Sequence, residues 1–189
     1  MDLSRLLERC SEGDELAWEA LVRQFQARIY GIAYHFVGNA EDARDLAQES
    51  FIRIYQNLAL ADAKTFLPWI IRITRNACID HLRRKKARPP AHDIAADDVL
   101  TLQAPGGDPD QIYAADSRKR LIHSALQQMS DLNREIILLK DIQGLALEEI
   151  ATLINVPLGT VKSRSNRARI ELARKLAVLR SKPAGGAAI

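Results

Sequence analysis

Long apolar runs are missing from this sequence of 189 residues. A membrane-spanning helix needs about 20 consecutive apolar residues, and no stretch of the chain approaches that length. The opening residues, MDLSRLLERC, also lack the apolar core of a secretory signal peptide. These absences predict a soluble, intracellular protein that does not itself span a membrane.

Cysteine is scarce, and its two occurrences, Cys10 and Cys78, lie too far apart for metal-ligand spacing. The four histidines share no ligand spacing either, and we find no glycine-rich phosphate loop and no nucleophile–base arrangement. We therefore expect buried or reduced thiols, a cytoplasmic location, and a protein that is not an enzyme and needs no metal, cofactor or small-molecule substrate.

Alternating patterns typical of β-strands are absent too, whereas apolar residues recur at steps of three and four along most of the chain. Hydrophobic residues make up 47% of the sequence, enough to form cores. The first part of the chain is predicted to form three helices, at 14–36, 40–58 and from Thr65 to about residue 88. The apolar stripe of the first includes Trp18, and that of the second comprises Ala47, Phe51, Ile54, Tyr55 and Leu58. The predicted buried stripe of the third comprises Leu67, Ile70, Ile71, Thr74, Ala77, Cys78 and Leu82. The second part is predicted to form four, at 111–129, 132–142, 147–154 and 158–179.

Residues 89–110 contain no Lys or Arg, but four prolines, two glycines and five aspartates. This composition is typical of a flexible acidic linker, although the run VLTL within it could form a brief docked segment. We therefore predict an all-α protein with a helical domain at 1–88, a linker at 89–110, a second helical domain at 111–182 and a disordered tail at 183–189.

Residues 147–169, LEEIATLINVPLGTVKSRSNRAR, have the pattern of a helix-turn-helix. In the second helix Val161, Ser165, Ala168 and Leu172 step by four, three and four, so they share an inner face. The outward residues are short and polar or cationic, which suits base edges and phosphates in the major groove of DNA. The residues turned outward are Thr160, Lys162, Ser163, Asn166, Arg167 and Arg169, with Arg164 near the edge.

A simpler explanation is that these cations only complement the dipole of a helix C-terminus. It accounts for Arg174 and Lys175. It does not account for Lys162 and Arg164, which lie near the positive N-terminal end of the helix, so DNA binding is favoured.

The helix predicted from Thr65 has a second, mixed face, on which Trp69, Asn76, Asp80 and Arg83 recur at helical steps. Trp and Asn can stack on or hydrogen-bond to unpaired bases, and arginines can hold phosphates. Alternatively Trp69 belongs to the core and Asp80 forms a surface ion pair, which contributes little. Periodicity alone leaves both interpretations open.

The helix predicted at 40–58 has an acidic outer face, with Asp42, Asp45, Gln48 and Glu49 alongside Ile52. Acidic side chains repel DNA, so this face suits another protein better. A simple solvated surface explains the pattern about as well, because acidic residues also stabilise a helix N-terminus.

Three stretches, in order and at matching spacing, together resemble bacterial sigma factors of the extracytoplasmic-function (ECF) group. The segment DARDLAQESFIRIYQNL resembles their core-polymerase-binding segment, and TFLPWIIRITRNACIDHLRRKKAR resembles their promoter-melting segment. The segment SDLNREIILLKDIQGLALEEIATLINVPLGTVKSRSNRAR resembles their C-terminal promoter-reading domain. The resemblance covers about residues 10–180.

The resemblance implies a transcription initiation factor that binds core RNA polymerase and promoter DNA, under the control of an anti-sigma factor that is often membrane-bound. It implies contacts of core polymerase with Asp45, Leu46, Gln48 and Glu49. Asn76 would lie near a flipped base of the minus-ten element, with the loop 60–64 shaping the base pocket and Arg72, Arg75 and Arg83 on the DNA backbone. The residues implied to read the minus-thirty-five element in the major groove are Thr160, Lys162, Ser163, Arg164 and Arg167.

The chain departs from the family at two positions. Ala146 stands where Ser or Thr usually caps a helix, a loss of about 0.5–2 kcal/mol. Ser165 stands where a bulky apolar residue is usual, and we expect its hydroxyl to bond back to the carbonyl one turn earlier. The rival interpretation is a dimeric transcriptional regulator that senses a signal through residues 1–88 and binds DNA without polymerase.

Overall fold

The computed structural model describes residues 2–87, 118 and 120–181. Within those residues the chain forms helices and no strand, and it divides into two compact units, Met1–Leu102 and Gln103–Ile189. The prediction of an all-α, two-unit fold is therefore confirmed. The predicted linker at 89–110 and the tail at 183–189 fall outside the described residues. No helix in the described part combines the length and apolar character needed to cross a membrane.

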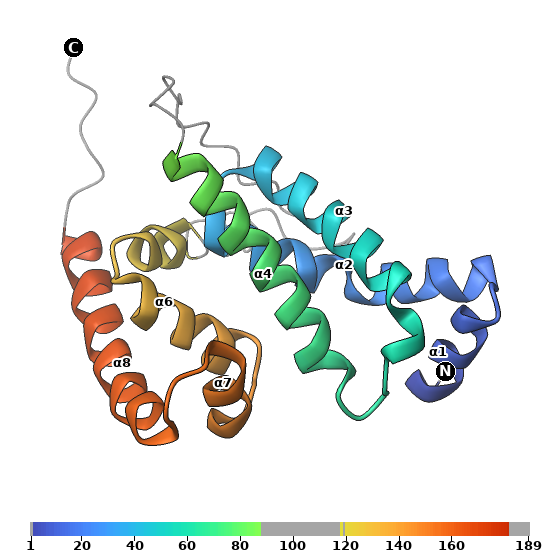
Figure 1. Cartoon of the computed structure of the whole chain (residues 1–189). Helices are drawn as coiled ribbons and strands as arrows, with labels where there is room; N and C mark the ends of the chain where they lie inside the picture. Colours follow the sequence, from blue (N-terminus) through green and yellow to red (C-terminus); the bar gives the residue numbers. More distant parts are fainter. Residues whose placement is uncertain (1, 88–117, 119, 182–189) are drawn as a thin grey trace, which may run out of the picture. The chain divides into compact units, whose positions relative to one another are not determined.

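The first unit is built on three long helices (Figure 1), α2 (Glu15–Val37), α3 (Ala40–Gln56) and α4 (Phe66–Ala87), and each packs against the other two. Their shared core is made largely of small side chains, which let the helix backbones approach closely. Its fully buried members include Ala33, Ala43, Leu46, Ala77 and Cys78.

Local chemistry fixes where these helices begin and end. Asp14 caps α2 by accepting the backbone N–H groups of Leu16 and Ala17, at 3.0 and 3.1 Å. Gly38, at φ 73°, ends α2 in the left-handed conformation that glycine adopts without strain. Asn39 follows directly and caps α3 in the same way as Asp14 caps α2.

Two short elements complete the described part of the first unit, and neither is among the predicted ones. Helix α1 (Leu3–Ser11) buries Leu6, Leu7 and Cys10 and packs on α2 and on the 3₁₀ turn η1 (Leu58–Leu60). A salt bridge of 2.6 Å from Arg9 to Asp14 ties the end of α1 to the cap of α2. α1 therefore supports both the start of α2 and the segment that leads into α4.

The predicted buried faces agree with the structure largely for α4 and in part for α3. In α4 Ile70, Ile71, Thr74, Ala77 and Cys78 are buried as predicted, whereas Leu67 and Leu82 are half-buried. In α3 Ala47 and Ile54 are buried as predicted, but the prediction for Tyr55 is wrong, because its exposed fraction is 54%. The buried stripe of α3 instead runs through Ala43, Leu46, Ala47, Ser50 and Ile54.

The second unit contains a helix over residues 120–127, α6 (Asp131–Ile137), α7 (Leu147–Ile154) and α8 (Leu158–Ser181). The helix predicted at 132–142 is α6 followed by a π-helical turn, η2 (Leu138–Ile142), in which Leu138 accepts the N–H of Gln143 at 2.9 Å. The core of the second unit is aliphatic and includes Leu126, Ile136, Leu139 and Ile150, all at most 1% exposed.

Candidate protein and nucleic-acid interfaces

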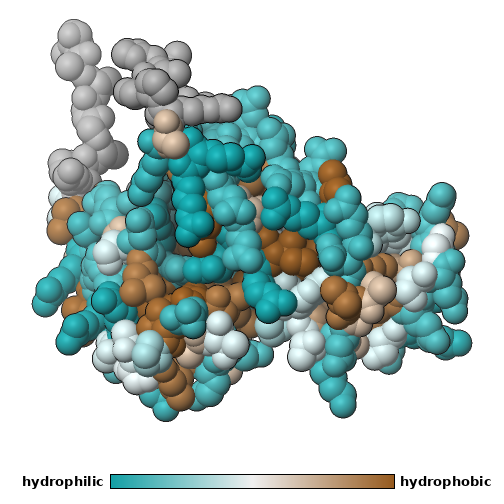
Figure 2. Space-filling view, in the orientation of Figure 1, coloured by the Kyte–Doolittle hydropathy of each residue, from teal (hydrophilic) through white to brown (hydrophobic). Residues whose placement is uncertain are grey.

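Helix α8 has a buried side and a cationic exposed side. Val161, Ser165 and Ala168 are at most 1% exposed, as the helix-turn-helix pattern predicts. On the other side Lys162, Ser163 and Arg167 are exposed, while Thr160 and Arg164 are half-buried at the edges. The visible outer side of α8 is accordingly mostly hydrophilic (Figure 2). This geometry leaves a row of cations and short polar side chains free to contact a ligand.

The turn before α8 is set by the backbone of Asn155, which adopts φ 53° and ends α7 in the left-handed conformation. α7 itself begins without a side-chain cap, because Ala146 has no acceptor atom. Its backbone N–H instead donates to the Glu149 carboxylate at 2.8 Å, so half of a capping box is present. The helix-turn-helix geometry is therefore kept despite the missing Ser or Thr.

Two polar contacts join η2 to α8. The Lys140 ammonium donates to the Ser165 hydroxyl at 3.2 Å, and the predicted bond from this hydroxyl to the carbonyl of Val161 is not formed in the described structure. One turn further on, Arg169 forms a two-point ion pair with Asp141. Neither contact was predicted, since the paired residues are more than 20 positions apart in the sequence.

The outer face of α4 carries the mixed residues singled out in the sequence. Arg72 and Asn76 are exposed, and Arg75 donates to the Asn76 amide oxygen at 3.4 Å. Trp69 is half-buried, with its ring 5.7 Å from that of Phe66. Trp69 thus belongs partly to the core and partly to this face, on which the Asn76 amide contacts the Arg75 guanidinium and Arg72 is exposed one turn earlier.

The C-terminal end of α4 is basic, with Arg83, Arg84, Lys85 and Lys86 all exposed. Arg83 and Asp80 form the surface ion pair considered in the sequence, at 3.9 Å. With side chains 78% and 51% exposed, such a pair contributes at most about 1 kcal/mol. Arg83 can therefore exchange this partner for a phosphate at little cost.

On α3, the four residues assigned to protein binding do not share one environment. Asp45 and Gln48 are exposed, and Glu49 is paired with Arg53 at 2.5 Å. Leu46 is only 2% exposed and lies in the core. The assignment of Leu46 to polymerase binding stays a prediction, and in this structure its side chain packs inside the first unit.

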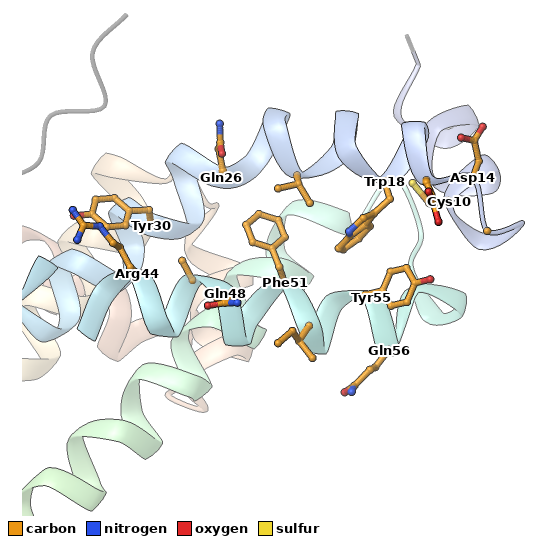
Figure 3. Close-up of a pocket in the computed structure, with 15 residues that line it drawn as sticks. Cys10, Asp14, Trp18, Gln26, Tyr30, Arg44, Gln48, Phe51, Tyr55 and Gln56 are labelled. Atoms are coloured by element: carbon orange, nitrogen blue, oxygen red, sulfur yellow. The ribbon is translucent and has the colours of Figure 1, made fainter. Parts of the chain in front are cut away.

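Beside this acidic face an apolar groove of about 1050 Å³ runs between α2 and α3. Figure 3 shows Trp18 and Tyr55 facing each other across it, with Phe51 pointing from α3 towards α2. The ring centroids of Trp18 and Tyr55 lie 4.9 Å apart. Because Trp18 and Tyr55 both belong to predicted apolar stripes, the sequence did not predict this groove, which joins an apolar surface to the acidic one.

Neither Cys10 nor Cys78 has the environment of a reactive thiol. Both thiols are free and buried, and burial raises the pKa of Cys78 to about 12 and also raises the pKa of Cys10. A thiol whose pKa is raised forms little of the reactive thiolate at neutral pH. No group of three side chains suited to a metal ion occurs among the described residues.

Comparison with known families gives two matches, one in each unit. Residues 21–88 match the model described as Sigma-70 region 2, and residues 119–172 match the model described as Sigma-70, region 4. α3 and α4 fall within the first match, and α6, α7 and the first half of α8 fall within the second.

Curated relatives match over nearly the whole chain. The RNA polymerase sigma-H factor of Pseudomonas aeruginosa is 34% identical over 171 residues, covering 87% of this chain and 89% of the relative. The ECF RNA polymerase sigma factor SigW of Bacillus subtilis is 33% identical over 184 residues, covering 93% and 97%.

Solved structures share the fold at lower identity. CnrH, determined in complex with the cytosolic domain of CnrY, matches at a TM-score of 0.67 and 22% identity, covering 97% of this chain and 100% of that one. The sigma factor RpoE of Bartonella quintana, determined with the anti-sigma factor NepR, matches at 0.64 and 22%, covering 85% and 96%.

Proposed function

This chain belongs to the ECF family of RNA polymerase sigma factors, and from that premise we propose how its surfaces divide the work of transcription initiation. A sigma factor binds core RNA polymerase and directs it to promoters, and it catalyses no reaction of its own. In this chain the acidic face of α3 binds polymerase, α4 holds the opened minus-ten element, and α8 reads the minus-thirty-five element. The observation that carries the proposal is the separation of α8 into a buried apolar side and an exposed cationic side.

The acidic face of α3 and the neighbouring groove form one docking surface for core polymerase. Asp45 and Gln48 supply exposed polar groups, and Ile52, 51% exposed, supplies apolar area beside them. A protein interface of this kind combines an apolar centre with a polar rim. Glu49 joins the rim by exchanging Arg53 for a cation of the polymerase.

The outer face of α4 captures a base of the minus-ten element after strand opening. Asn76 is exposed and its amide can both donate to and accept from a base edge, while Arg72, Arg75 and Arg83 hold the backbone of the unpaired strand. The loop 60–64, which runs from the last residue of η1 towards α4, closes the pocket. Unstacking a base costs a few kcal/mol, and capture of the flipped base offsets part of that cost.

Helix α8 enters the major groove at the minus-thirty-five element. Thr160 and Ser163 lie near its N-terminal end, where recognition helices contact base edges. Lys162, Arg164 and Arg167 surround them and bind phosphates or guanine.

Control by an anti-sigma factor fits the same surfaces. The fold matches RpoE, which was determined in complex with the anti-sigma factor NepR. An inhibitor of this kind would cover the α3 face and the apolar groove and so compete with polymerase. The chain acts in the cytoplasm, where polymerase and promoter DNA meet.

Run-off transcription with purified core polymerase tests the proposal. The Lys162→Glu/Arg167→Glu variant should lose transcription from a promoter that depends on its minus-thirty-five element, because two phosphate or base contacts become repulsive. Lys175→Glu/Arg180→Glu makes the same change in charge further along α8 and should keep most of the activity. Normal transcription by the first variant would show that α8 is not the reader.

A further inference from the structure

The π-helical turn η2 brings two consecutive side chains against α8. An extra residue in a helical turn shifts the side chains that follow it, and such turns recur at functional sites. Here Lys140 reaches the buried Ser165, and Asp141 reaches Arg169, from across 25 and 28 residues of sequence. The turn therefore aims its polar side chains at the helix that carries the DNA-facing residues.

The Asp141–Arg169 contact has the geometry of a directional pair. Arg169 Nη2 lies 2.5 Å from one carboxylate oxygen and Nε lies 3.2 Å from the other. Two parallel N–H···O bonds fix the orientation of both groups as well as their distance. The side chains are 52% and 30% exposed, so the pair adds little to stability. The main effect of the pair is to fix the position of Arg169 relative to Asp141.

A second polar contact holds α8 at the other end of α6. The Glu171 carboxylate accepts the backbone N–H of Ser130 at 3.1 Å and the Asn133 amide at 2.6 Å. Arg169 and Glu171, two residues apart on α8, thus bond to opposite ends of the α6–η2 segment. Contacts at two separate points restrict the orientation of α8 more than a single contact would.

Small rotations of α8 matter at its reading end. Thr160 lies nine residues from Arg169, which is about 13 Å along a helix that rises about 1.5 Å per residue. A tilt of about 10° at Arg169 would move Thr160 by about 2 Å, enough to break hydrogen bonds that tolerate a few tenths of an ångström.

We propose that the Asp141–Arg169 pair is a strut that sets the angle of α8, and that Arg169 serves recognition by positioning this helix rather than by contacting DNA. The proposal rests on the reading of the minus-thirty-five element by α8. Arg169 then has a different role from Lys162 and Arg167, which contact DNA, although all three are exposed cations on one helix.

A charge swap tests the strut in holoenzyme bound to a promoter that needs its minus-thirty-five element. Arg169→Asp and Asp141→Arg should each lower the ratio of specific to non-specific affinity by about tenfold. The double variant restores the pair in reverse and should recover to within about threefold of the original ratio. Recovery on this scale requires that the two residues act on each other.

The salt dependence gives an independent readout, because each phosphate contact adds about one to the slope of log affinity against log salt concentration. Arg169→Gln should leave the slope unchanged while lowering specificity, whereas Arg167→Gln should reduce the slope by about one. A slope reduced by Arg169→Gln, or a charge swap that restores nothing while both variants stay folded, would overturn the strut. If Lys162→Glu/Arg167→Glu leaves binding intact in the same assay, the reader assignment itself has failed.

Discussion

Asp45 and Glu49 lie one helical turn apart on α3, yet they are not equally available to a partner. Glu49 already pairs with Arg53, whereas Asp45 is exposed and has no ion-pair partner among the described residues. A new partner must displace Arg53 to reach Glu49, but it meets Asp45 directly. Within the proposed polymerase-binding face, Asp45 is therefore the more sensitive position.

Asp45→Arg should weaken binding of core polymerase by about tenfold or more, because a favourable charge becomes a repulsive one at the interface. The fold should be unaffected, since the side chain is exposed. Affinity for fluorescently labelled sigma factor measures the change. Glu19→Arg, an exposed acidic residue of α2 that does not line the groove, is the matched control. Equal binding by both variants would contradict the assignment of the α3 face.

Asp14 links acid stability to the cap of α2. The N–H of Ala17 bonds to the Asp14 carboxylate, and together with the Arg9 side chain it lowers the pKa of Asp14 below its usual value of 3.8. A lowered folded-state pKa means that the ionised cap stabilises the first unit fully above about pH 4. This contribution is lost as pH falls through the lower, folded-state value.

Asp14→Asn should therefore lower the unfolding midpoint of the first unit at pH 6, and the gap to the parent should narrow as pH falls below 3.8. Asn keeps a capping oxygen, so the change isolates the charge. Tryptophan fluorescence follows this unit alone, because the two tryptophans, Trp18 and Trp69, both lie in it. A gap that stays constant with pH would exclude Asp14 as the titrating group.

At the scale of elements, the missing cap of α7 is a weak point that can be repaired. Ala146 already has the extended backbone of an N-cap residue, at φ −67° and ψ 151°, and Glu149 already supplies the reciprocal bond. Only the side-chain acceptor is absent. α7 leads into the turn before α8, so its stability bears on the helix-turn-helix as a whole.

Ala146→Ser should stabilise the second unit by about 0.5–2 kcal/mol. Far-UV circular dichroism during denaturation reports both units, while tryptophan fluorescence reports only the first. The dichroism transition of the second unit should move to higher denaturant while the fluorescence transition stays in place. Ala151→Ser, the same substitution inside α7, should destabilise the unit instead. Stabilisation by both variants would show that the gain does not come from the cap.

The exposed and buried faces of α4 and α8 could be predicted from sequence because their apolar residues keep a regular helical step. The buried face of α3 could be predicted only in part, since Ser50 looks polar in the sequence. Its hydroxyl donates to the Leu46 carbonyl at 2.6 Å, which lets the residue lie in the core. When a polar side chain bonds to its own helix, the residue can be buried, and its polarity in the sequence then wrongly predicts exposure.

Other features escape prediction because they depend on packing between distant segments. A nine-residue helix such as α1 is marginal alone, and contacts with α2 and η1 stabilise it. Trp18 and Tyr55 line the groove between α2 and α3 and stay partly exposed there. Their partial exposure depends on how the two helices pack, which the sequence pattern does not show. The partners Asp141 and Arg169 are 28 positions apart in the sequence, and helical periodicity relates only residues three or four positions apart.

At the scale of the whole molecule, a sigma factor couples two DNA contacts through one chain bound to polymerase. Once one unit is engaged, the other searches a small volume, so its binding becomes effectively intramolecular. Two contacts that are weak separately can then hold a promoter together. Under the proposed assignment, α8 contributes the duplex contact and α4 contributes the single-strand contact.

Combining protein variants with promoter variants separates these contacts. On a promoter whose minus-thirty-five element is scrambled, Thr160→Ala/Ser163→Ala on α8 should cause little further loss, because variant and scramble remove the same base contacts. Asn76→Ala should cause its full loss on either promoter, since it acts at the minus-ten element. Each base contact is worth about 1–3 kcal/mol, or about five- to 150-fold in open-complex lifetime at fixed salt.

The pattern of additivity, more than the size of any single loss, identifies which element each helix reads. If the α8 variant were simply misfolded, it would lower transcription on both promoters by the same factor. If α4 and α8 both acted at one element, Asn76→Ala would lose its effect on the scrambled promoter. Only separate readers on one chain give redundancy between the α8 variant and the scramble together with independence between Asn76→Ala and the scramble.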